Sequence, residues 1–72
     1  MFTVRQARLM SGNTQQDLAN LLGISVHSYR RIEKRPGTAT IQFARNFSRV
    51  IKLPIDKIFF GRHSTYRRYR EK

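Results

Sequence analysis

Apolar residues spaced three and four positions apart divide the first part of the chain into helix-sized stretches. Thr3 and Thr14 each precede such a stretch as N-caps, and Gln6 completes a capping box with Thr3. Gly12 and Gly23 follow the two stretches, and glycine ends helices readily because it adopts the left-handed conformation without penalty. The pattern predicts a first helix between Thr3 and Gly12 and a second between Thr14 and Gly23.

The remaining pattern predicts three more helices. Ser25 caps a third helix, which the Pro36-Gly37 pair ends, and Thr40 caps a fourth helix with a broad apolar face. Pro54 favours a helix start, so residues 55–60 are predicted to form a short fifth helix. No strand is predicted. The expected fold class is therefore all-α, a compact five-helix bundle.

Residues 1–61 are expected to form one domain, because a 72-residue chain has room for only one core. Residues 62–72 are rich in charge and lack apolar periodicity, so we expect a basic, weakly ordered tail. Tyr66 and Tyr69 alternate there with arginines, which suits stacking and charge together. This mixture suits nucleic acid, so the tail could bind nucleic acid in addition to any contact that the domain makes, fold on a partner or act as a solubilising extension.

Charge decides which partners are plausible. The chain contains fifteen Lys and Arg residues and four Asp and Glu residues, for a net charge of +11. Self-repulsion on this scale favours an anionic partner, which could be nucleic acid, an acidic protein or an anionic membrane. Nucleic acid is the favoured class. No apolar run approaches the ~20 residues of a membrane span, so no membrane role is expected, and the protein should be intracellular.

Catalysis and metal binding find little support in the composition. The chain has no cysteine, and His27 and His63 lie far apart without an acidic partner nearby. No nucleophile and base stand at a recognisable spacing, and four acidic residues leave little from which to build a site. We therefore expect no enzyme activity, no metal and no cofactor.

The second and third predicted helices together suggest a helix-turn-helix. They are joined by a tight turn at Gly23, and the third helix is basic. The major groove of B-DNA is about 12 Å wide and admits one α-helix. A helix presented by a compact support can enter that groove, while the N-terminus of the supporting helix meets the phosphate backbone.

A series of residues in this region resembles the XRE-type helix-turn-helix family, which includes the Cro and CI regulators of temperate phages. The likeness extends from Val4 to Phe59 and rests on Arg8, Thr14-Gln15-Gln16-Asp17-Leu18-Ala19, Gly23-Ile24-Ser25, Ile32-Glu33 and the run IKLPIDKIF. The resemblance implies a five-helix domain that binds double-stranded DNA in a sequence-specific manner. It also implies a transcriptional regulator of the bacterial cytoplasm, from a phage or mobile element, with a homodimer as one option.

The resemblance also implies roles for individual residues. Val26, His27 and Arg31 correspond to the positions that face bases, and arginine can fork onto guanine O6 and N7. Arg8 and Glu33 correspond to a structural salt bridge. The residues expected near phosphates are Gln15, Ser28, Arg30, Lys34, Arg35 and Thr38. Gln15 should also brace the third helix. Exposed, solvated side chains are the competing interpretation for the basic residues among these.

Departures from the family pattern leave an alternative open. Lys34-Arg35 stands where the family favours Asn-Gly, and Val26 cannot hydrogen-bond to a base. An antirepressor or modulator would keep this fold but bind a phage repressor, alone or together with DNA. The residues considered for such a protein interface are Phe59, Phe60, Tyr66 and Tyr69.

Overall fold

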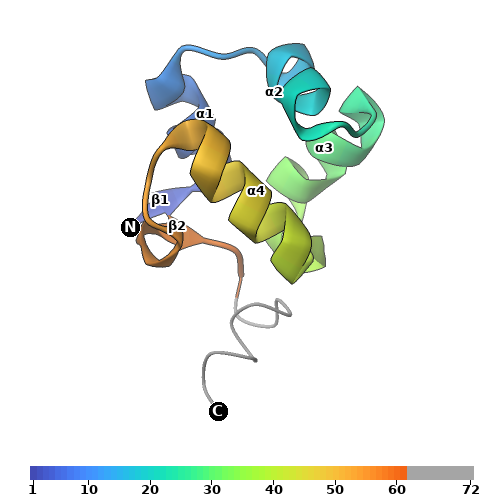
Figure 1. The fold of residues 1–72 in the computed structure, drawn as a ribbon. Coiled ribbons are helices and arrows are strands. Elements are labelled where there is room, and N and C mark those ends of the chain that lie inside the picture. The colour runs from blue at the N-terminus through green and yellow to red at the C-terminus, as the bar shows by residue number, and fades with distance from the viewer. Residues whose placement is uncertain (62–72) are drawn as a thin grey trace.

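The computed structural model describes residues 1–61, in which four α-helices surround one core (Figure 1). The elements in chain order are β1 (Phe2–Thr3), α1 (Val4–Ser11), α2 (Gln15–Leu22), α3 (Val26–Lys34), the 3₁₀ turn η1 (Pro36–Thr38), α4 (Ile41–Ile51), the 3₁₀ turn η2 (Ile55–Lys57) and β2 (Ile58–Phe59). Of the helices in this part of the chain, none is long and apolar enough to cross a membrane. The predicted tail of residues 62–72 lies outside the described residues.

The predicted helix starts are confirmed by their capping geometry. Thr3 and Gln6 exchange two hydrogen bonds of 3.0 Å at the start of α1, as a capping box requires. Thr14 and Asp17 make the same exchange at the start of α2. Ser25 caps α3 by accepting the N–H three residues ahead. The first four backbone N–H groups of a helix have no partner within the helix. A side chain that accepts a hydrogen bond from one of them therefore stabilises the helix by about 1 kcal/mol.

The predicted fifth helix at residues 55–60 is wrong. Only Ile55–Lys57 is helical, as a single 3₁₀ turn, and Ile58–Phe59 pairs in parallel with Phe2–Thr3. The alternation of burial explains the difference. Ile58 and Phe60 are 3% and 2% exposed, while Phe59 between them is half-buried. Inward positions two residues apart are a strand pattern.

Aromatic rings form the centre of the core. Phe43 stacks on Phe47 with ring centroids 5.5 Å apart, and Phe60 meets Phe47 edge-on at 6.4 Å. Tyr29 extends the cluster from α3, with its ring 6.3 Å from that of Phe43. The face of α3 that carries Tyr29 is therefore fixed against α4. The burial of Phe60 also corrects its assignment to a protein interface, since its ring packs inside the fold.

Candidate nucleic-acid interface

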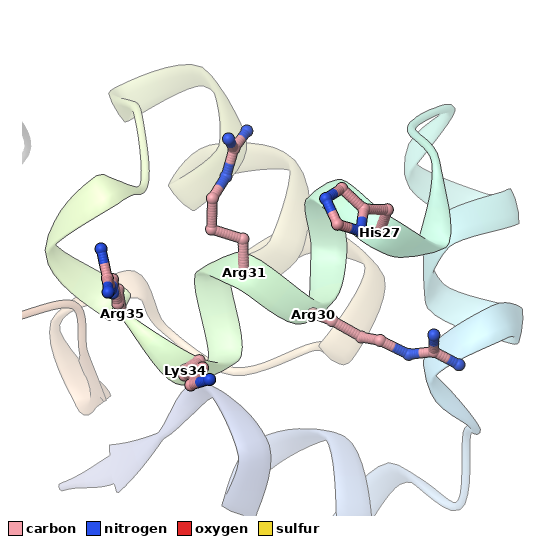
Figure 2. A pocket seen from close by; sticks show the side chains of 5 residues that line it. All are labelled: His27, Arg30, Arg31, Lys34 and Arg35. Carbon is pink, nitrogen blue, oxygen red and sulfur yellow. The ribbon is translucent and has the colours of Figure 1, made fainter.

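The outward face of α3 carries a stripe of basic side chains. His27, Arg30, Arg31 and Lys34 recur at the spacing of three and four residues that aligns side chains on one side of a helix. They are all exposed, and with Arg35 they line one open concavity of about 450 Å³ (Figure 2). All five residues lie between positions 27 and 35, because four of them belong to α3 and Arg35 directly follows its last residue.

Arg30 and Arg31 point in different directions (Figure 2). Arg30 reaches toward the start of α2, where its Nε donates a 3.0 Å hydrogen bond to Oε1 of Gln15. In the part of the chain that the structure describes, the guanidinium of Arg31 has no such partner. Its five donors are therefore free for a planar acceptor such as a guanine edge or a phosphate.

A buried ion pair holds α3 against the rest of the fold. Nε of Arg8 in α1 lies 2.6 Å from Oε2 of Glu33 in α3, and the two side chains are only 11% and 6% exposed. The expected pair is thus present. Gln15 donates from Nε2 to the other Glu33 oxygen at 3.0 Å. Since Gln15 also accepts from Arg30, one continuous chain of hydrogen bonds joins α1, α2 and the basic face of α3.

The charges of this pair shift the ionisation of both groups. Hydrogen bonding to Glu33 raises the pKa of Arg8. Burial alone would raise the pKa of the Glu33 carboxyl, but the opposing interactions, led by the hydrogen bond from Arg8, hold that pKa below its usual value. Burial raises the pKa of the neighbouring Tyr29 hydroxyl, which has no hydrogen-bond partner among the described residues. Glu33 is therefore charged at neutral pH beside a neutral phenol.

This pair predicts how stability depends on pH. The pKa of Glu33 is lower in the folded state than its usual value of 4.5, so the unfolded chain takes up the proton first as the pH falls. The stabilisation is therefore complete above pH 4.5 and is lost as the pH falls through the folded pKa.

Urea unfolding measured from pH 7 to pH 3 should show that the difference in the free energy of unfolding between the native protein and Glu33→Gln shrinks below pH 4.5. An unchanged difference down to pH 3 would contradict the assignment. Asp56→Asn is the matched control, because it removes an exposed carboxylate and keeps Glu33. Its free energy of unfolding should decrease below pH 4.5 as that of the native protein does.

The other predicted contacts occupy varied positions. His27 is exposed beside Arg31, whereas Val26 is half-buried and packs against the core. Ser28 is half-buried, and its hydroxyl accepts a hydrogen bond from that of Ser25 at 3.1 Å. Thr38 is exposed and donates to the Arg35 carbonyl at 2.8 Å. Their assignment to bases or phosphates stays a prediction. Tyr66 and Tyr69 lie outside the described residues.

The sequence predicts that Gln15 braces the third helix, but it does not predict the hydrogen bond between Gln15 and Arg30. The two residues lie 15 positions apart, and no local spacing signals their meeting. The orientation of Arg30 follows only from how α2 and α3 pack. Residues 1–61 contain no group of three His, Asp or Glu side chains that could hold a metal ion.

Comparison with known proteins identifies the arrangement. A family model described as helix-turn-helix matches residues 4–58, which include all four helices and the basic stripe of α3. No curated protein and no solved structure gives a significant match to the chain.

Proposed function

Because the chain belongs to the XRE-type helix-turn-helix family of DNA-binding transcription regulators, we propose that it is a sequence-specific regulator of the Cro/CI type, from a temperate phage or mobile element. In this proposal α3 lies in the major groove of double-stranded DNA, and α2 sets its N-terminus against the backbone. Two copies would then read half-sites about 34 Å apart.

The basic stripe on a braced helix is the observation that carries this proposal. Four basic side chains of lysine and arginine line the concavity: Arg30, Arg31, Lys34 and Arg35. A stripe of this kind attracts the polyanionic backbone. Reading a sequence requires in addition that the helix be held still, because a base contact works only within hydrogen-bond distance. The ion pair between Arg8 and Glu33 supplies that restraint from inside the fold.

Each side chain of the stripe has a proposed role. Arg31, with an unengaged guanidinium, reads a guanine edge. Arg30 binds a phosphate near the start of α2 together with Gln15, which already holds its Nε. Lys34 and Arg35 bind phosphates beyond the C-terminal end of α3. The half-buried side chain of Val26 leaves little more than a methyl contact with thymine.

Replacement of Arg31 by alanine tests this proposal. Arg31→Ala should weaken binding to a selected site by about 1–3 kcal/mol, roughly 5- to 150-fold, and change binding to random DNA little. Arg35→Ala should weaken both alike, since a phosphate contact carries no sequence information. Arg5→Ala is the matched control, because Arg5 is exposed on α1 and lies outside the concavity. The site is first selected from a random library, and affinities are then measured by titration.

Two outcomes would contradict the first choice. Equal losses on selected and random DNA for Arg31→Ala would remove the base-reading role. If Arg31→Ala keeps its affinity for DNA but no longer binds a co-expressed repressor, the protein acts as an antirepressor. In that case the arginines of α3 would face acidic side chains instead of bases.

A further inference from the structure

The outward face of α4 carries a second set of basic side chains, apart from the concavity of α3. Arg45 and Arg49 lie one helical turn apart, and Lys52 follows directly after the last residue of the helix. All three are exposed. Within residues 1–61, none of these side chains has a partner in an ion pair or a hydrogen bond. We call these three residues the α4 stripe.

The acidic residues of the described fold leave the charge of the α4 stripe unneutralised. Glu33 is buried with Arg8. Asp17 accepts a hydrogen bond from the Thr14 N–H at 2.9 Å at the start of α2, and Asp56 lies in η2. No acidic residue of the part that the structure describes belongs to α4, so an anion that pairs with the stripe is not supplied by residues 1–61.

The α4 stripe and the concavity of α3 lie on different faces of the domain. The two helices pack together through Tyr29 and Phe43, whose ring centroids are 6.3 Å apart (Figure 1). Tyr29 is on the side of α3 opposite its basic residues, and Phe43 is on the side of α4 opposite the stripe. Each basic set therefore points away from the shared core, and a duplex that receives α3 leaves the α4 stripe facing solvent.

The composition of this face favours a phosphate backbone over an acidic protein as its partner. The exposed residues of α4 are Gln42, Arg45 and Arg49, so the face has no exposed apolar or aromatic side chain. Such side chains form the centre of protein interfaces. A phosphate backbone, in contrast, is bound by cations and amide donors alone. The amides of Gln42 and Asn46 lie on the same helix, where the first donates to the second at 3.5 Å.

We infer that the α4 stripe binds the phosphate backbone of a second segment of double-stranded DNA, so that one copy of the protein joins two segments. The inference rests on the proposed function, in which α3 occupies the first segment. The stripe contacts phosphates and no bases, so the second segment is bound whatever its sequence. Two DNA segments repel each other, and a net charge of +11 placed between them offsets that repulsion.

A capture experiment with the full chain tests this inference. A duplex that carries the selected site is immobilised and saturated with protein, unbound protein is washed away, and a labelled duplex of random sequence is added. The retained label is measured between about 50 and 200 mM salt. Arg45→Gln/Arg49→Gln is compared with Arg5→Gln/Lys57→Gln, which removes the same charge from exposed positions on α1 and η2. Both variants should melt at the temperature of the native protein, because the replaced side chains are exposed.

The native protein and the control should retain the labelled duplex at low salt. Three neutralised phosphates give a log–log slope of retention against salt of about −3. Arg45→Gln/Arg49→Gln should retain about tenfold less label and reduce the magnitude of that slope by about two. Its affinity for the selected site alone should equal that of the control, because α3 is unchanged in both.

Three results would overturn the inference. The first is equal retention by the two variants. The second is retention only when the labelled duplex also carries the selected site, because α3 of a second copy would then hold it. The third is that the native protein retains no second duplex at any salt concentration, which would leave an acidic protein as the partner of the α4 stripe.

The failure of this inference is separable from that of the proposed function. If Arg31→Ala loses the selected site while the two double variants retain equal label, α3 reads DNA and the α4 stripe does not bind it. If the native protein shows no preference for any selected site, the proposed function fails at its base-reading step, whatever Arg45→Gln/Arg49→Gln does.

Discussion

Raising the salt concentration from 50 to 200 mM should weaken DNA binding about a thousandfold. Four cations line the concavity of α3, and the segment after Gly61 supplies further positive charge. If about six phosphates are neutralised in all, the log–log slope of affinity against salt lies near −5, because each neutralised phosphate releases condensed counterions. Because the net charge is +11, the release of counterions should be the dominant contribution to the binding of any DNA.

The slope is measured by titrating labelled duplex at several salt concentrations. Random duplex should give nearly the same slope as the selected site, because both present the same phosphates. An uncharged analogue with a methylphosphonate backbone is the matched control and should bind weakly at every salt concentration. A slope near zero on natural duplex would remove the electrostatic basis of the interface.

Replacement of Glu33 by alanine should lower the free energy of unfolding by about 3 kcal/mol. The change leaves the Arg8 guanidinium, 11% exposed, without its carboxylate, and removal of one partner from a buried pair is costly because the other charge stays desolvated. Gln15 loses its acceptor at the same time. Small domains have roughly 5 kcal/mol of stability to lose, so this single change should remove more than half of it and clearly lower the melting temperature.

A double-mutant cycle isolates this interaction. Urea unfolding of Arg8→Ala, Glu33→Ala and the double variant should give losses that are far from additive, since the second removal takes away a charge that is already unpaired. Strictly additive losses would mean that the two side chains do not stabilise each other. Arg5→Ala, an exposed arginine on the same helix, should change stability by less than about 0.5 kcal/mol.

The helix starts could be predicted from the sequence because capping is local. A threonine or serine and the backbone N–H it caps lie within three residues, so the short stretch itself carries the information. The strand at Ile58–Phe59 could not be predicted in this way. Two residues give almost no periodicity, and the partner that selects the extended form lies at Phe2–Thr3, at the other end of the domain.

In the candidate site, too, the features that depend on local sequence could be predicted, and those that depend on tertiary contacts could not. The side on which His27, Arg31 and Lys34 lie follows from helical spacing alone. The orientation of Arg30 depends on Gln15 across a tertiary contact, and the half-burial of Val26 depends on packing against the core. A helical wheel counts Val26 as an outward position because the wheel contains no neighbouring elements.

The pairing of β1 with β2 also has a consequence for how the protein is made. Phe2 pairs with Ile58, so the first strand to leave the ribosome waits for nearly the whole domain to be synthesised. The contacts between α2 and α3 are close in sequence and can form early, whereas closing the two ends of the domain requires a long loop. The contact between α2 and α3 can therefore form on the nascent chain before β1 and β2 pair.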